Sequence, residues 1–499
     1  MRFRHARMLD LVSGRCSEPR DVIVCGSRVQ RSGMPADHDS ADDEVIDLKG
    51  RFIMPGLWDA HVHTDLWAQN RARIDLSGAD SIAQALKILD SRATAEPGDE
   101  PLVATGARLG SWLDAEDTHR LDALCPGRAV VVCSRDLHSV WVNDAVLCDP
   151  EFARRADGAS AGSLLREQDA FAVERIYLDA PAGTMDQWVD AAARAAARRG
   201  VVGIVDFQDS PDRVSTWRRR ISSFRPSVRV SVSCWPHTLQ EAIEDKMTTG
   251  FPLDDHGWLL GGPLKVILDG SLSSGTAWCT RPYAHPVPGV DPFGEALVSP
   301  AELSHLMSRA EMNGLHTSVH AIGDAAIATA LDCFAETGAQ GGIEHACLAT
   351  GTELDRMAVL GVRASVQPAH LLDDRELLES QCPDRTGDAF ALHSCLAAGV
   401  RMSFGSDAPV APLDPWLAIS AAVLRARPGE PSWHPEQRLG IGEAMRASTG
   451  GIGKLVPGGQ ADLIVLDENP LTRDPQELAG TAVHLTMAAG QITWWADAE

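Results

Sequence analysis

Gly56-Leu-Trp-Asp-Ala-His-Val-His63 is the first of eight short apolar runs in the middle of the chain. Each run has the length of a buried strand, and several of the segments between them carry helical periodicity. One such segment, 185–199, is rich in Ala and is followed by Gly200, which is typical of a helix end. The other seven runs are Val201–Phe207, Val228–Trp235, Pro263–Gly270, Leu315–His320, Gly342–His345, Val362–Gln367 and Val400–Ser406. Eight buried strands alternating with helices predict an α/β protein built on a (β/α)8 TIM barrel. An open, doubly wound sheet is the alternative.

About 130 residues separate the first run from the second. A stretch of this length is too long for a loop in a compact domain, so we expect a structured insertion over the barrel mouth, at about 70–195. It contains two strand-like runs of its own, Pro101–Ala107 and Ala129–Ser134.

The two ends of the chain contain short β-like runs. Val22–Val24 and Glu44–Leu48 are too short to form an independent core, and Ala461–Leu466 and the alternating stretch Ala482–Trp495 offer them partners. We therefore expect residues 1–54 and 451–499 to form one small β-sandwich domain beside a barrel of residues 55–450.

The composition is that of a globular protein. The chain has 499 residues, 44% of them hydrophobic and 23% charged, and a formal net charge of -24, which repels a phosphate backbone and argues against nucleic acid as a partner. No window approaches a membrane span and Met1–Asp10 lacks the apolar segment of a secretory signal, so we expect a cytoplasmic protein without a membrane partner. The eleven Cys include no CxxC pair and are expected to be reduced. Monomer and homodimer are both compatible with this composition.

Two histidines at the end of the first run have the spacing of a metal site. In Asp59-Ala-His61-Val-His63 the two imidazoles point to the same side of a strand, roughly 7 Å apart along it, and both can reach one ion. Three further residues strengthen this weak motif, because His320 ends the fifth run, His345 ends the sixth and Asp407 follows the eighth. In a barrel all five lie at the end where active sites form. Imidazole and carboxylate ligands without a thiolate favour Zn²⁺, with Mn²⁺, Fe²⁺ and Co²⁺ as alternatives.

Lys265 lies inside the apolar run Pro263–Asp269, where an isolated ammonium is costly. It can form an ion pair with Asp269 or Asp407. Alternatively, its neutral amine takes up CO₂ to form a carbamate whose two oxygens bridge two metal ions. A metal-activated hydroxide then attacks the scissile carbonyl, and Asp407 accepts the proton as general base and returns it as general acid.

Several motifs together resemble the amidohydrolase superfamily. They are Pro55–His63, Val319-His-Ala-Ile-Gly-Asp324, Ile343-Glu-His-Ala346 and Gly405-Ser-Asp407. The chain is most similar to amidohydrolase family 3, which includes N-substituted formamide deformylases, because Leu264–Ala277, His138–Asn143 and Gly458–Leu463 also fit that pattern.

The resemblance implies a distorted barrel with a binuclear metal centre. His61, His63 and Asp407 would hold the first ion, and His320 and His345 the second, with carboxylated Lys265 bridging the two. A mononuclear site that uses His61, His63 and Asp407 together with His320 or His345 is the alternative. For substrate contacts we expect His138 and Arg135 in the insertion, and Ser271 and Ser274 in the Gly-rich loop that follows Lys265. Asp324 and Glu344 adjoin ligand positions and are expected to orient metal-bound imidazoles.

The expected function is hydrolysis of a non-peptide C–N bond in a small amide, such as an N-formyl or N-acyl amine. A mononuclear deaminase of a heterocycle is the second interpretation. Such enzymes generally have a catalytic Glu close to the histidine of the fifth strand, and no Glu follows His320 closely, which counts against this interpretation. A barrel without catalytic activity, kept as a binding protein, is the third, and a missing ligand would be its signature.

Overall fold

The computed structural model describes residues 1–33, 44–107, 109, 120–134, 139–155, 163–178, 180–287 and 289–498. The chain divides into two compact units. One contains Met1–Thr64 and Ala193–Glu499, and the other contains Asp65–Ala192. No helix among the described residues is long and apolar enough to cross a membrane.

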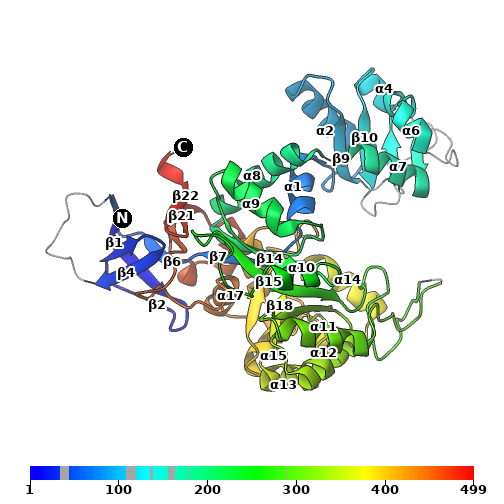
Figure 1. Ribbon diagram of the computed structural model, residues 1–499. Helices are drawn as coiled ribbons and strands as arrows, with labels where there is room; N and C mark the ends of the chain where they lie inside the picture. Colours follow the sequence, from blue (N-terminus) through cyan, green and yellow to red (C-terminus); the bar gives the residue numbers. More distant parts are fainter. Residues whose placement is uncertain are drawn as a thin grey trace. The chain divides into compact units, whose positions relative to one another are not determined.

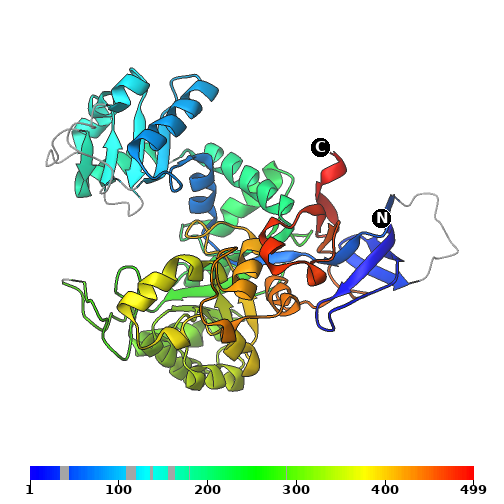
Figure 2. The same cartoon turned by 180° about the vertical axis from the view of Figure 1, so that it is seen from behind.

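Eight parallel strands form the central sheet of the first unit, and all eight coincide with the apolar runs (Figures 1 and 2). A parallel bridge between Val62 and Ala408 links the first strand to the chain just after the last one, so that the sheet nearly closes on itself. In order they are β7 (Leu57–Val62), β13 (Val201–Asp206), β14 (Arg229–Cys234), β15 (Leu259–Ile267), β16 (Thr317–Ala321), β17 (Gly341–His345), β18 (Arg363–Val366) and β19 (Met402–Phe404). The predicted (β/α)8 barrel is confirmed.

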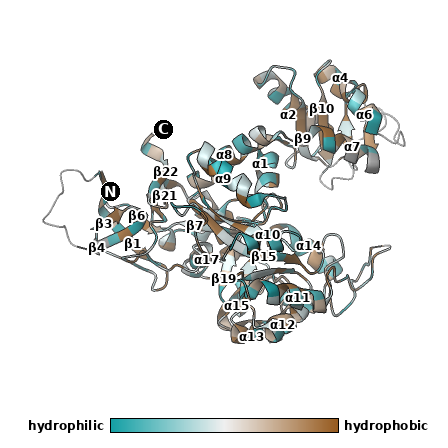
Figure 3. Ribbon diagram, in the orientation of Figure 1, coloured by the Kyte–Doolittle hydropathy of each residue, from teal (hydrophilic) through white to brown (hydrophobic). Residues whose placement is uncertain are grey.

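Helices follow the barrel strands, and α11 buries one apolar face made of Leu303, Leu306, Met307 and Ala310. In Figure 3 the outer helices α11 and α12 each carry both hydrophilic and hydrophobic residues. Local sequence sets their ends: the side chain of Ser299 caps α11, and Gly338 ends α12 at φ 65°, a conformation that favours glycine. The helices of this part are α8 (Ala182–Arg198), α9 (Arg213–Ser223), α10 (Leu239–Glu244), α11 (Pro300–Glu311), α12 (Asp324–Thr337), α13 (Gly351–Leu360), α14 (Leu371–Gln381), α15 (Leu392–Ala397), α16 (Pro415–Leu424) and α17 (Ile441–Ser448).

Both ends of the chain contribute to a second, nine-stranded sheet. Its longest strand, β1 (Arg2–Asp10), pairs with four others, although its sequence does not alternate regularly. The buried apolar residues are Phe3, Ala6 and Leu9, and a register irregularity between Phe3 and Ala6 shifts the inward-facing side by one residue. The other strands are β2 (Arg15–Cys16), β3 (Arg20–Cys25), β4 (Arg28–Gly33), β5 (Val45–Asp47), β6 (Phe52–Pro55), β20 (Leu463–Leu466), β21 (Val483–Ala488) and β22 (Gln491–Trp495).

The second unit has a five-stranded sheet of its own, in the order β12-β11-β10-β9-β8. Its strands are β8 (Ile74–Asp75), β9 (Leu102–Ala107), β10 (Val130–Ser134), β11 (Ser139–Val142) and β12 (Leu164–Arg166). Both faces are covered, because Val130 and Val132 belong to one buried apolar cluster and Val131 and Cys133 to another. The helices described in this region are α1 (Thr64–Ala72), α2 (Ile82–Ala95), α4 (Arg120–Leu124), α5 (Asp144–Leu147), α6 (Pro150–Arg155) and α7 (Glu167–Tyr177).

Candidate metal centre

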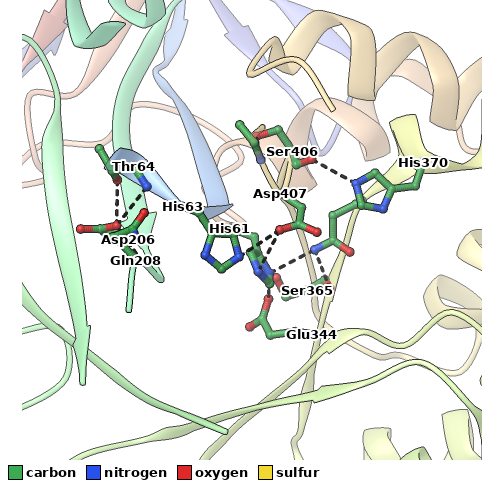
Figure 4. Close-up of polar contacts among 12 residues, drawn as sticks. His61, His63, Thr64, Asp206, Gln208, Glu344, Ser365, His370, Ser406 and Asp407 are labelled. Atoms are coloured by element: carbon green, nitrogen blue, oxygen red, sulfur yellow. Dashed lines mark hydrogen bonds and ion pairs between the residues drawn. The ribbon is translucent and has the colours of Figure 1, made fainter. Parts of the chain in front are cut away.

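His61 and His63 lie at the carboxyl end of β7 and face the same carboxylate. The distance to Asp407 Oδ1 is 3.4 Å from His61 Nε2 and 3.3 Å from His63 Nε2 (Figure 4). The two-residue spacing on a strand therefore brings both imidazoles to one point, as the sequence predicts. His61 is buried, whereas the side chain of His63 keeps 25% of its surface exposed. His63 is therefore the member of this pair that borders solvent.

Backbone hydrogen bonds fix Asp407 against β7. Its amide donates to His61 O (2.8 Å), and the amide of His63 donates to Ala408 O (2.9 Å). One oxygen of Asp59 accepts from the amides of both Ser406 and His61, at 2.9 and 3.1 Å. Burial alone would raise the pKa of Asp407, but the charge of His61 and the hydrogen bond of His63 hold it well below its usual range. Asp407 is therefore an ionised carboxylate, as a metal ligand must be.

His345 ends β17 and His320 is the next-to-last residue of β16, and their ring centroids lie 4.5 Å apart. The structure thus brings all five predicted ligand side chains to the carboxyl end of the barrel strands. His320 Nε2 also lies 3.3 Å from Gly270 O. Burial lowers the pKa of His61, His345 and His320, the last to about 3, and the positive charge of Lys265 acts in the same direction. Neutral imidazoles of this kind are the form that binds metal ions.

His370 joins this group, although the sequence reasoning passed over it. It ends the short 3-10 helix Pro368–His370 after β18, and its ring stacks near that of His345, with centroids 6.2 Å apart. Among the described residues, two sets of three potential ligands have their ligand atoms within 4.8 Å of one another: His61, His63 and Asp407, and His345, His370 and Asp407. The signal in the sequence is a histidine three residues beyond an apolar run, in Gln367-Pro-Ala-His370, where the proline favours a turn over a strand end.

Lys265 lies on β15 and is 1% exposed. Within the described part of the chain its Nζ has no hydrogen-bond partner, and it lies 4.5 Å from the centroid of the Phe207 ring. Burial lowers the pKa of the Lys265 amine, opposed by the charges of Glu344 and Asp407. No ion pair with Asp269 is recorded there, since that carboxylate instead accepts from the amides of Trp278 and Gly323, each at 2.9 Å. An amine that is buried, unpaired and shifted toward neutrality has the properties that carbamate formation requires.

Glu344 contacts His61 directly, with Oε2 2.8 Å from Nδ1. Burial would raise the pKa of Glu344, but the hydrogen bond and charge of His61 lower it to about 2. Holding Nδ1–H of His61 in this way leaves Nε2 with its lone pair toward Asp407, an arrangement typical of metal-bound histidine. Asp324, the other expected orienting residue, accepts instead from the amide of Thr280 at 2.9 Å and from its hydroxyl.

Changing Glu344 to Gln should weaken metal binding at His61. The amide can still accept the hydrogen bond but lacks the charge that makes the imidazole a better ligand, so we expect the affinity for metal to fall by about 10- to 100-fold. Competition with a chromophoric chelator measures this affinity. Glu376→Gln, on an exposed position of α14, is the matched control. An unchanged affinity in E344Q would show that the charge of Glu344 has no role in metal binding.

The predicted substrate-binding residues divide into two groups. Ser271 and Ser274 lie in the loop after β15 and are bonded to each other, with their hydroxyl oxygens 2.9 Å apart, and Ser274 also contacts Thr276 at 2.6 Å. Their hydroxyls thus form a polar cluster in that loop. Arg135 and His138 lie outside the described residues.

Asp206 at the end of β13 forms a buried ion pair beside the metal centre. Its carboxylate accepts from Arg213 and Trp217 and from the hydroxyl of Thr64, with 2.6 Å to Arg213 Nη2. We expect Asp206→Ala to lower the free energy of unfolding by about 3–5 kcal/mol, because it leaves a buried guanidinium without its carboxylate. Urea denaturation measures the change, with Asp209→Ala as control, since Asp209 is half exposed in the same loop. A loss below about 1 kcal/mol, the value typical of a surface pair, would contradict this assignment.

The donor set fits a divalent metal ion, because imidazole and carboxylate groups converge and no thiolate is among them. The model of the amidohydrolase family matches residues 44–494. The chain belongs to the amidohydrolase family. It is accordingly a hydrolase that acts on C–N bonds, and the predicted family is confirmed.

Relatives of this amidohydrolase match along most of their length. It is 26% identical to the protein LONG AFTER FAR-RED 3 of Arabidopsis thaliana, covering 90% of this chain and 83% of that protein. It is 23% identical to the N-substituted formamide deformylase of Arthrobacter pascens, covering 97% and 96%. The crystal structure of an uncharacterized metal-dependent hydrolase from Pyrococcus horikoshii OT3 shares the fold, with a TM-score of 0.78 at 24% identity over 95% of this chain and 98% of the other.

Proposed function

We propose that this amidohydrolase hydrolyses the amide bond of a small N-formyl or N-acyl amine with the help of bound divalent metal ions, for which zinc is the expected element. One observation carries the proposal: two sets of metal-ligand side chains share Asp407 beside the unpaired amine of Lys265. The similarity to an N-substituted formamide deformylase supports the choice of substrate class.

Each residue near the centre has a distinct part in the proposed reaction. A bound divalent ion supplies a Lewis acid and lowers the pKa of water. Asp407 is ionised and therefore able to accept a proton from the attacking water and return it to the departing amine nitrogen. The Lys265 amine adds to CO₂ and releases a proton, which converts a buried base into an anion with two oxygen ligands. The products are a carboxylic acid, formic acid in the case of an N-formyl amine, and a free amine.

The experiment is a substrate panel with separate detection of the two nitrogen products. We expect N-formyl and N-acyl amines to release a primary amine, and the activity to be lost on dialysis against chelator and restored by Zn²⁺. Heterocyclic amines, assayed for ammonia, test the deaminase alternative. Ammonia release without amide cleavage would contradict the proposed substrate class, and amide cleavage that survives complete metal removal would contradict the proposed chemistry.

A further inference from the structure

A second set of potential ligands lies beside the pair His61 and His63. Figure 4 shows His61 and His63 on one side of the Asp407 carboxylate and His370 on the other. His345 completes the second set, with one nitrogen of each imidazole and one oxygen of Asp407 within 4.8 Å of one another. Ligands of one zinc ion, each about 2 Å from it, lie no more than roughly 4 Å apart, so a small inward movement would close this set on a cation.

His370 makes a hydrogen bond of the kind that metal-bound histidines make. Its Nε2 lies 3.2 Å from Ser406 O, so the tautomer with the proton on Nε2 donates to that carbonyl and leaves a lone pair on Nδ1. A backbone carbonyl that fixes the free N–H is the usual companion of a metal-bound imidazole. The carbonyl belongs to the residue next to Asp407, so the same contact ties His370 to the shared carboxylate.

His320 is placed differently. In the part of the chain that the structure describes, His320 belongs to neither set of three that meets the 4.8 Å limit. Its Nε2 lies 3.3 Å from Gly270 O and 3.6 Å from Asp269 Oδ1, on the side of the β15 loop. The ring centroid of His320 is closer to that of His345 than the centroid of His370 is, at 4.5 Å against 6.2 Å, but among the described residues it is His370 that shares a set of converging ligand atoms with both His345 and Asp407.

We propose that His370 is a metal ligand, and that with His345 and Asp407 it forms a second position for a divalent cation. The inference rests on the proposed function, because it presupposes a first ion at His61, His63 and Asp407. Asp407 would then contribute to both positions, so that two Lewis-acidic cations would be held beside one carboxylate. The sequence interpretation, in which His320 and His345 hold the second ion, makes no use of His370.

The test uses Co²⁺ as the probe and His370→Gln as the variant. Glutamine can keep the hydrogen bond to Ser406 O, because its amide nitrogen takes a place similar to that of Nε2, but it offers no imidazole lone pair. The full chain is produced in cobalt-supplemented medium and purified without chelator, and cobalt per chain is measured by elemental mass spectrometry together with the visible absorption of Co²⁺. His393→Gln, at an exposed position of α15, is the matched control.

We expect about two cobalt ions per chain in the unmodified protein and in H393Q, and about one in H370Q, with a changed absorption spectrum. Two ions in H370Q, or a single ion in the unmodified protein, would overturn the second position while leaving the first intact. No cobalt in the unmodified protein would instead overturn the proposed function, and this inference with it. If H370Q does not fold, anomalous diffraction at the cobalt edge from the unmodified protein decides: an ion bound to His370 supports the proposal, and a second ion held by His320 without His370 overturns it.

Discussion

Asp407→Asn is expected to reduce kcat/KM for amide hydrolysis by about a thousandfold or more, the range over which a lost general base and a weakened metal site act together. Asp407 is the one carboxylate common to both sets of ligands, and its pKa lies well below the usual range. Asparagine preserves the shape of the side chain and the backbone hydrogen bond from residue 407 to His61 O, so the effect reports the lost charge rather than a rearranged loop.

The measurement for Asp407 combines steady-state kinetics with metal content. The control is Asp355→Asn, an exposed carboxylate on α13 that should leave both quantities unchanged. We expect D407N to lose metal as well as activity. A variant that keeps its metal and more than about a tenth of the activity would contradict the role of Asp407 in proton transfer.

Lys265→Ala is expected to lower activity by about a hundredfold or more and to lower metal content in parallel, because a ligand shared by two ions is removed. The Lys265 amine is buried and without a hydrogen-bond partner among the described residues, so its removal leaves no broken ion pair to explain the loss. A short carboxylic acid such as acetate should restore part of both properties, since its two oxygens replace those of the carbamate.

The control for Lys265 is Lys87→Ala, on an exposed position of α2. Intact mass measured with and without bicarbonate adds a readout that does not depend on substrate, because the carbamate increases the mass by that of one CO₂. Full activity and full metal content in K265A would contradict a bridging carbamate. A loss of activity that acetate does not reverse would leave Lys265 a role other than that of a bridge.

The barrel could be predicted because parallel strands buried on both faces appear in the sequence as uninterrupted apolar runs. All eight runs became strands, the histidines at the ends of the first and sixth lie beside Asp407, and His320 of the fifth lies next to His345. Strand ends are the positions that sequence reasoning places best, since the topology alone brings them to one end of a barrel.

The features that the sequence did not reveal depend on irregular backbone or on distant contacts. Strand β1, the first strand of the sheet built from the chain ends, could not be predicted, because the register irregularity near Phe3 breaks the alternation of buried residues. His370 lies in a turn after a proline, where the direction of a side chain does not follow from strand periodicity. The sequence predicted that Glu344 orients a metal-bound imidazole, but not that this imidazole is His61, which is 283 positions away and becomes its neighbour only in the folded barrel.

Metal content per chain tests the central claim most directly. Protein purified without chelator is analysed by elemental mass spectrometry, and its intact mass is recorded in bicarbonate. We expect about two divalent ions per chain and a Lys265 that carries one CO₂. One ion with an unmodified Lys265 would contradict the binuclear centre and favour mononuclear chemistry, and a chain that binds no metal would contradict the proposed function itself.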